Sequence, residues 1–359
     1  MRAALLHTTG DEKLEVVDDV EITAPGPGEV TVKIEATGVC HSDLHAMDGS
    51  LPQGAPFVPG HEGAGVITAV GDGVDTLAVG DHVVVAWSPP CGKCNNCVDR
   101  KQPHLCVMIQ FAIAGVPRFT RGDEQVFGMA GTGTFAEQLI LPQEAAIKID
   151  DDVPFEIASL IGCGVSTGVG AVINTAKVEP GSSVVVFGCG GVGISAIQGA
   201  RVAGAAKIVA VDLNPDKHEV AKSFGATHAC APDDLAALQA ELTGDGFDYA
   251  FEAIGLPVTM RAAYDAVRRG GTACIIGVGG MDKEVSFNGF EIFFGEKTFM
   301  GSYYGSVDVR SDFRRLLDLW KAGQLDLESM ITKRMSIDDI NDAFDLLRKG
   351  EAVRTVITF

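Results

Sequence analysis

Residues 183–193 read SVVVFGCGGVG, and this stretch decides the fold. An apolar run, 183–187, leads directly into glycines spaced as G-x-G-x-x-G at the start of a helical segment. In such a strand-to-helix turn the glycines permit a tight bend, close approach of a pyrophosphate, and packing of the helix on the strand. The stretch therefore predicts a dinucleotide-binding βαβ unit, whose cofactor loop consists of Gly188, Gly190, Gly191, Val192 and Gly193.

The residues that follow extend this unit. A second apolar run, 208–212, ends at Asp212, about 20 residues after Gly193, where an acid hydrogen-bonds the adenosine ribose. Its carboxylate would repel a 2′-phosphate, so we expect NAD rather than NADP. Further strand candidates at 249–253 and 272–276 alternate with helical segments, which predicts a doubly wound parallel sheet.

The chain before about residue 150 has a different pattern of apolar residues. Short runs rich in Val and Ile, such as 29–34, 65–70 and 82–86, are separated by Gly and Pro, which indicates a β-rich domain. After about residue 302 the pattern is mixed again, with helices expected near 312–322 and 338–348 and a final strand ending at Phe359. These changes predict an α/β chain of two domains.

Charge and composition exclude several classes of partner. The chain of 359 residues has 28 Lys and Arg against 48 Asp and Glu, a formal net charge of −20. This surface repels phosphate backbones and anionic lipids, so we expect neither nucleic acid nor a membrane as partner. Two uncharged stretches, 157–176 and 180–200, are long enough to span a bilayer but are rich in Gly, Ser, Thr and Asn. No signal-peptide pattern begins the chain, and nine cysteines fit a reducing compartment, so we expect a cytoplasmic protein.

Four of the cysteines lie close together in the sequence, as C-x2-C-x2-C-x8-C: Cys91, Cys94, Cys97 and Cys106. Four thiolates at such spacing favour a closed tetrahedral zinc site, which has no open coordination position and is therefore structural. An iron–sulfur cluster is the alternative. Bacterial ferredoxin runs, however, have a shorter last gap followed by Pro, whereas Val107 follows Cys106.

Three scattered segments carry a resemblance to a known family: Cys40 in GVCHSD, His61 in GHEGAG and Cys163 in IGCGVSTGVG. Together with GCGGVG and the closing RTVITF, they resemble the zinc-dependent alcohol dehydrogenases of the medium-chain dehydrogenase/reductase superfamily, from Met1 to Phe359. The resemblance implies a GroES-like catalytic domain and a Rossmann domain. It also implies that Cys40, His61 and Cys163 hold a second, catalytic zinc with an open fourth position.

The same resemblance assigns further site residues. Asp43 would orient the ligand histidine and Glu62 would lie beside the metal. Ser42 would take the alcohol proton, and His45 would pass it to solvent through the nicotinamide ribose. The cofactor would contact His41 and Arg354 at the pyrophosphate, Lys217 at the adenosine ribose, Thr167 and Val192 at the nicotinamide ring, and also Ile276 and Val278.

Six apolar positions match the substrate pocket: Leu51, Trp87, Met129, Ala130, Val278 and Tyr303. They suit a primary or secondary alcohol, or the corresponding aldehyde or ketone, as the small-molecule partner. An enzyme that oxidises S-(hydroxymethyl)glutathione is an alternative, although no basic residue stands at these positions. The sequence also leaves open an enzyme with permanently bound NAD(H) and a non-catalytic nucleotide-binding interaction protein, the latter marked by loss of zinc ligands.

The predicted organisation is a catalytic domain of residues 1–164 and 302–359, with a zinc lobe at about 88–110, split by an NAD-binding domain of residues 165–301. The gap between Cys97 and Cys106 is one residue longer than is typical of the family, so this loop should bulge. The resemblance also implies a homodimer, with a tetramer as the alternative. The edge strand that pairs the two copies is expected near 284–287, followed by the apolar segment 292–300.

Overall fold

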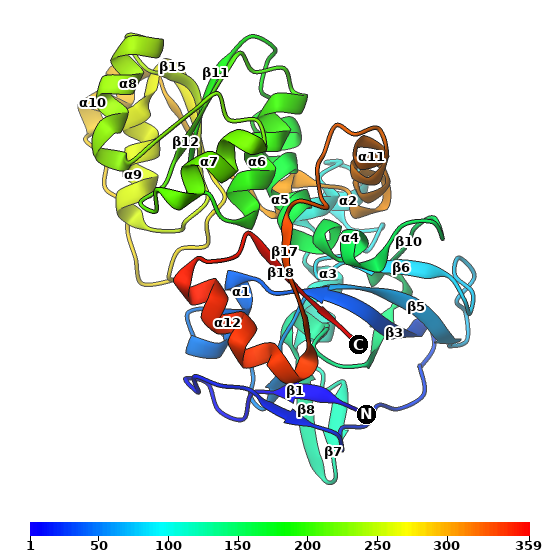
Figure 1. Ribbon diagram of the computed structural model, residues 1–359. Coiled ribbons are helices and arrows are strands. Elements are labelled where there is room, and N and C mark those ends of the chain that lie inside the picture. The colour runs from blue at the N-terminus through cyan, green and yellow to red at the C-terminus, as the bar shows by residue number, and fades with distance from the viewer. The chain divides into compact units, whose positions relative to one another are not determined.

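The computed structural model describes residues 1–359, and the chain divides into two compact units (Figure 1). Unit 1 comprises Met1–Gly164, Asp308–Lys321 and Leu327–Phe359, and unit 2 comprises Val165–Val307 and Ala322–Asp326. The chain thus returns to unit 1 at Asp308 rather than at the predicted residue 302. The reason is local, because the hydroxyls of Ser302 and Ser306 hydrogen-bond Thr175 of unit 2 at 2.9 and 2.7 Å.

Unit 1 is built on mostly antiparallel sheets, in which β17 and β18, and β4 and β8, are parallel pairs. The largest has seven strands in the order β10-β6-β5-β3-β18-β17, with β9 also paired to β3. A three-stranded sheet, β4-β8-β7, and a two-stranded sheet, β1-β2, complete it. The strands are β1 (Ala3–Leu5), β2 (Glu15–Val17), β3 (Glu29–Gly38), β4 (Phe57–Val58), β5 (Glu62–Val70), β6 (His82–Val85), β7 (Phe119–Arg121), β8 (Glu124–Gly128), β9 (Gln138–Pro142), β10 (Ala146–Lys148), β17 (Ile331–Ser336) and β18 (Arg354–Thr358).

The register of the two central strands positions the site. In the antiparallel pair of β3 and β5, Gly38 stands opposite Glu62, so the segment that leaves β3 lies beside the segment that enters β5. The helices of this unit are α1 (His41–Asp48), α2 (Asn95–Val98), α3 (Met108–Ala114), α4 (Phe155–Leu160), α11 (Val309–Lys321) and α12 (Ile340–Lys349). The core includes Phe135 and Phe344, whose rings meet edge to face with centroids 6.0 Å apart.

Unit 2 is a parallel six-stranded sheet in the order β13-β12-β11-β14-β15-β16. Counted within the unit, this is the order 3-2-1-4-5-6 of the Rossmann fold. All five residues of β11 are buried, as in a parallel strand covered on both faces. The strands are β11 (Ser183–Phe187), β12 (Lys207–Val211), β13 (His228–Cys230), β14 (Phe247–Glu252), β15 (Val267–Ile275) and β16 (Thr298–Gly301), and the helices are α5 (Ser166–Gly170), α6 (Gly191–Val202), α7 (Asp216–Ser223), α8 (Leu235–Leu242), α9 (Pro257–Ala266) and α10 (Gly289–Gly295).

The predicted edge strand near 284–287 is wrong. The edge of the sheet is β16, and residues 284–287 are not in a strand. Phe287 instead packs its ring against Tyr264 and Phe299, with centroids 4.8 Å from each. The Asn288 side chain then accepts the Phe290 N–H and begins α10, which contains part of the expected apolar segment.

One continuous helical run, Phe155–Thr175, is long and apolar enough to cross a membrane. Length and composition alone are therefore not enough to distinguish this run from a membrane span. However, 83% of its apolar window is buried inside the protein, which is the environment of a core helix.

Candidate functional site

Four potential metal ligands converge in unit 1: Cys40, His61, Glu62 and Cys163. Their ligand atoms all lie within 4.8 Å of one another, and all four residues are buried. Cys40 precedes α1, His61 precedes β5, and Cys163 lies in the helical run that follows α4. The pairing of β3 with β5 brings the first two segments together, so residues far apart in the sequence form one donor cluster.

Asp43 connects two of these donors. Its Oδ1 lies 2.9 Å from Nδ1 of His61, and its Oδ2 accepts the Cys40 N–H at 2.9 Å. Because the carboxylate holds a proton on Nδ1, the lone pair of the neutral ring is on Nε2. That Nε2 atom is buried and has no hydrogen-bond partner, which is the arrangement of a histidine metal ligand with a carboxylate behind it.

The buried donors change one another's protonation. A hydrogen bond from Cys163 is the main cause that holds the pKa of Cys40 well below its usual range, and the charge of His61 lowers it further. Burial alone would lower the pKa of His61, but Asp43 and then Cys40 raise it to about 10, so a cation that binds Nε2 must displace a proton from it. A thiolate-prone sulfur beside an oriented imidazole matches the preference of Zn²⁺ for sulfur and nitrogen donors.

Glu62 forms an ion pair with Arg354, and both side chains are at least nine-tenths buried. The pair lies against Gly38, where a Cβ atom would be 2.1 Å from Glu62 Oε2. Sequence reasoning missed this pairing, because Glu62 begins β5 and Arg354 begins β18 near the end of the chain. By resemblance, Arg354 was expected to contact the pyrophosphate of the cofactor. In the structure its guanidinium also pairs with Glu62 within unit 1.

The expected proton relay lies on α1. Ser42 and His45 are three positions apart in this helix and therefore share a face. Both are partly buried, whereas His41 is exposed. The His45 Nδ1 atom is 3.9 Å from the carboxylate of Asp48, an ion-pair distance that is too long for a hydrogen bond.

Four further cysteines form a second cluster, with all sulfurs within 4.8 Å of one another: Cys91, Cys94, Cys97 and Cys106. Cys94 Sγ lies 3.6 Å from Cys97 Sγ and 3.7 Å from Cys106 Sγ. The Lys93 N–H is the main group that lowers the pKa of Cys91 to about 6, whereas burial and Cys94 raise that of Cys97 to about 12. The longer last gap is taken up by a 3-10 turn, Pro103–Leu105, so it does not separate Cys106 from the others.

The glycine loop of unit 2 has the geometry that its pattern predicts. Gly188 has a φ of +93°, and a Cβ on Gly193 would lie only 1.7 Å from the Gly188 carbonyl oxygen. Gly190 has no atom within 4 Å of its Cβ position, so the space above the loop is open. Asp212 follows β12, accepts the Cys189 N–H at 2.8 Å and lies 3.7 Å from Lys217 Nζ.

Another carboxylate at this end of the sheet was not singled out from the sequence. Glu252 ends β14 and is fully buried. Its Oε1 accepts from the Ile254 and Gly255 N–H groups at 3.0 and 2.8 Å and from the Thr259 hydroxyl at 2.7 Å. Only its position at a strand end could have indicated this role, which is to shape the loop after β14.

The expected pocket residues are divided between the units. In unit 1, Trp87 contacts the ring of His61 edge to face, with centroids 6.4 Å apart, and Met129 is 5% exposed. Ala130 has a left-handed φ of 52°, and its N–H donates to Gln53 at 3.2 Å. Leu51 also belongs to unit 1, whereas the pocket residues Val278 and Tyr303 belong to unit 2, as do the expected cofactor residues Thr167 and Ile276.

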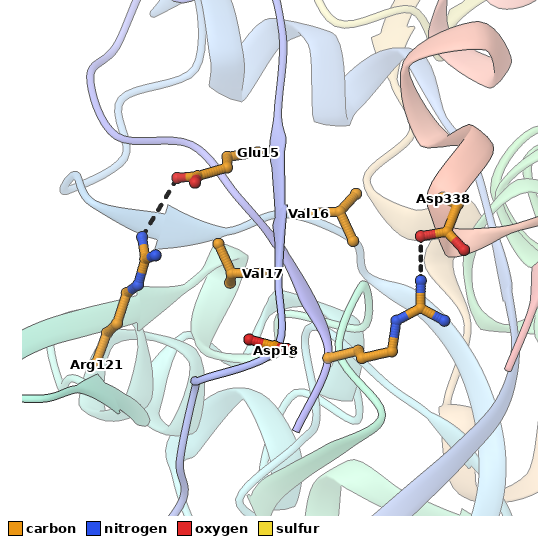
Figure 2. Close-up of a pocket in the computed structure, with 7 residues that line it drawn as sticks. Glu15, Val16, Val17, Asp18, Arg121 and Asp338 are labelled. Atoms are coloured by element: carbon orange, nitrogen blue, oxygen red, sulfur yellow. Dashed lines mark hydrogen bonds and ion pairs between the residues drawn. The ribbon is translucent and has the colours of Figure 1, made fainter.

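A separate open surface pocket lies on the two-stranded sheet of unit 1 (Figure 2). Its polar wall includes ion pairs between Arg121 and Glu15 and between Arg2 and Asp338. No predicted site residue lines it, and each of its two arginines is already paired with a carboxylate.

Comparisons with known proteins agree with these features. Residues 26–151 match the family described as alcohol dehydrogenase GroES-like domain, and residues 191–322 match zinc-binding dehydrogenase. An S-(hydroxymethyl)glutathione dehydrogenase from Escherichia coli O1:K1 is 40% identical, with 100% of this chain and 99% of the relative covered. Benzyl alcohol dehydrogenase from Acinetobacter calcoaceticus has a TM-score of 0.92 at 33% identity, covering 100% and 99% of the two chains. An alcohol dehydrogenase from E. coli CFT073, solved with NADH, has a TM-score of 0.83 at 25% identity, again covering 100% and 99%.

Proposed function

Since this chain belongs to the zinc-dependent alcohol dehydrogenase family of the medium-chain dehydrogenase/reductase superfamily, we propose that Cys40, His61 and Cys163 hold its catalytic zinc. The enzyme is an NAD-dependent oxidoreductase that transfers hydride between an alcohol and the corresponding aldehyde or ketone. The observation that carries the assignment is the buried, unpartnered Nε2 of His61, which Asp43 aims at the two cysteines.

Bound there, zinc would supply Lewis-acid chemistry, which makes an alcohol easier to deprotonate. The protein's own groups do the rest. Asp43 fixes the ring orientation of His61 and, through the Cys40 N–H, the start of α1. Ser42 would accept the alcohol proton and His45 would release it to solvent, in a site whose donors are shielded from water.

The tetracysteine cluster takes the second zinc. Four thiolates would leave no open coordination position, so this metal would stabilise the lobe and take no part in turnover. Unit 1 serves as the catalytic domain and unit 2 as the NAD-binding domain. The carboxylate of Asp212 favours NAD over NADP, because a 2′-phosphate beside it would place like charges in a partly buried site.

The substrate is an apolar primary or secondary alcohol. Trp87 and Met129, the expected pocket residues described above in unit 1, are apolar, and no expected pocket residue has a basic side chain. The second candidate is S-(hydroxymethyl)glutathione, favoured by the relative that is 40% identical over the whole chain. That adduct carries carboxylates, which the apolar positions would not neutralise.

The protein acts in the cytoplasm as a homodimer that pairs the edges of two unit 2 sheets. The edge strand β16 would supply the backbone groups, and α10 beside it exposes Phe290 and Phe293, which are 69% and 79% accessible. Light scattering checks this assembly: a mass of one chain contradicts it, and a mass of four chains means that two dimers associate.

A spectrophotometric screen tests the function directly. Purified protein, assayed for zinc, is mixed with NAD and a series of aliphatic and aromatic alcohols, and with S-(hydroxymethyl)glutathione, while NADH absorbance is followed. We expect two zinc ions per chain and higher kcat/KM for apolar alcohols. Higher kcat/KM for the glutathione adduct would select the second candidate. Turnover without added NAD would indicate a permanently bound cofactor, and no turnover with any substrate would favour a non-catalytic protein.

A further inference from the structure

We propose that the turn formed by residues 131–134 positions His61, with the Thr132 hydroxyl as the positioning group. We also propose that this turn links His61 to the tetracysteine lobe, the segment of about 88–110 that contains the four clustered cysteines. The inference rests on the proposed assignment of Cys40, His61 and Cys163 as metal ligands. All residues in it belong to unit 1.

The turn contacts Gly60, the residue directly before His61. Its carbonyl oxygen accepts three hydrogen bonds, from the Thr132 hydroxyl at 3.1 Å and from the Gly133 and Thr134 N–H groups at 3.2 and 3.0 Å. Its N–H donates to Asp43 Oδ1 at 3.1 Å. Both polar groups of Gly60 are therefore held, one by the turn and one by the carboxylate that orients His61.

Close packing leaves Gly60 no freedom to shift. Its φ is +93°, and a Cβ atom there would lie 2.6 Å from Thr134 Oγ1 and 2.7 Å from the Phe135 nitrogen. Thr134 is itself anchored, because its hydroxyl meets that of Thr37 on β3 at 2.7 Å. A displacement of the turn therefore moves the backbone that carries His61.

The Thr132 hydroxyl connects the turn to two backbone carbonyl groups. Its side chain is fully buried, and its hydroxyl lies 2.7 Å from the Met129 carbonyl oxygen as well as 3.1 Å from that of Gly60. One hydroxyl proton is thus shared between two carbonyls, one in the expected substrate pocket and one beside the ligand histidine. Removing it would leave these buried carbonyl oxygens with fewer donors.

On its other side, the turn contacts the helix that follows the tetracysteine lobe. Helix α3 begins two residues after Cys106 and buries a single side chain, that of Ile113. A Cβ atom on Gly131 would lie 2.3 Å from Ile113 Cγ1, so α3 rests directly on the turn. Cys106 is 1% exposed, and Asn96 of α2 donates to the neighbouring Leu105 carbonyl at 2.7 Å. The chain of contacts from the lobe to His61 is therefore continuous.

Two substitutions at one position test the hydroxyl. Thr132→Val removes it at nearly constant size, and Thr132→Ser keeps it. Each protein is loaded with Co²⁺, and the visible spectrum and the rate of metal release to a chelator are measured. The signal of the catalytic site is the part that Cys163→Ser removes. Thr31→Val, at another buried threonine of the same unit, is the matched control for stability.

We expect Thr132→Val to shift the Cys163-dependent spectrum and to speed release of that cobalt about tenfold, as for other groups that orient a metal ligand. Thr132→Ser and Thr31→Val should match the wild type in both measurements. A Thr132→Val spectrum and release rate equal to wild type would overturn the positioning role. A wild-type protein without any Cys163-dependent signal would instead overturn the proposed function.

The link to the lobe has its own test. Ile113→Ala should shift the same spectral band in the same direction, and its effect combined with Thr132→Val should be less than additive, because both act through one turn. An Ile113→Ala protein with an unchanged catalytic-site spectrum, or strictly additive effects, would overturn the link.

Discussion

Oδ1 of Asp43 lies 2.9 Å from Nδ1 of His61, and the same oxygen accepts the Gly60 N–H at 3.1 Å. The carboxylate therefore fixes both the ring and the backbone that leads to it. Its other oxygen holds the Cys40 N–H at 2.9 Å. One buried side chain thus sets the relative position of two donors from different segments, which is the arrangement that prepares a site before its metal binds.

Asp43→Asn should weaken metal binding at this site by about 10- to 100-fold, because the amide lacks the charge and one of the two acceptor oxygens. Chelator competition followed by elemental analysis measures the change. The tetracysteine zinc should be retained, and Asp72→Asn, at an exposed position in the same unit, serves as the control. Equal metal affinity in Asp43→Asn and wild type would contradict the role given to this carboxylate.

Cys163→Ser and Cys94→Ser should fail in different ways. The first should lower kcat by roughly a thousandfold with little change in Tm, because one ligand of the catalytic site is lost. The second should release the lobe metal and cost about 3 kcal/mol or more of unfolding free energy. Zinc content, Tm and kcat measured on both proteins check the contrast, and a stable Cys94→Ser protein with two zinc ions would refute it.

Asp212→Gly should raise the ratio of kcat/KM for NADP to that for NAD at least about tenfold, which corresponds to about 1.4 kcal/mol. Loss of the carboxylate also frees Lys217, now 3.7 Å from it, to meet a 2′-phosphate. Asp212→Asn separates charge from shape, since the amide oxygen still accepts from one backbone N–H. If the charge of Asp212 determines the cofactor preference, the ratio of kcat/KM for NADP to that for NAD should rise in both variants. An unchanged ratio in both would show that cofactor choice lies elsewhere.

Gly193→Ala and Gly190→Ala should separate packing from ligand binding. At Gly193 the new methyl group would lie 1.7 Å from the Gly188 carbonyl oxygen. The free energy of unfolding should therefore fall by about 1–3 kcal/mol, Tm should fall with it, and NAD affinity should decrease. At Gly190 no protein atom lies within 4 Å, so stability should remain and only NAD binding should weaken. Thermal unfolding and NAD titration measure the two effects. Unaltered NAD binding in Gly190→Ala would place the pyrophosphate elsewhere.

The sequence determined those features that depend on local patterns. Residues 183–193 predict a strand, a tight turn and a helix because the buried run and the glycine spacing act within one βαβ unit, and β11 and α6 lie there. The tetracysteine cluster follows for the same reason, since its members are close in the chain and a single lobe brings their sulfurs together. Cys40, His61 and Cys163 could be singled out only by resemblance, because nothing local joins them.

Tertiary structure alone decided the contacts between distant segments. The pairing of β3 with β5 places His61 near Cys40, and the arrival of β18 beside β3 brings Arg354 to Glu62. The three hydrogen bonds on the Gly60 carbonyl come from a turn about 70 residues further along the chain. The edge of the parallel sheet is β16 rather than residues 284–287, because an aromatic cluster and the Asn288 cap direct that segment into a loop and a helix. Such outcomes depend on which strands and side chains meet in space, and periodicity in one segment does not encode its partners.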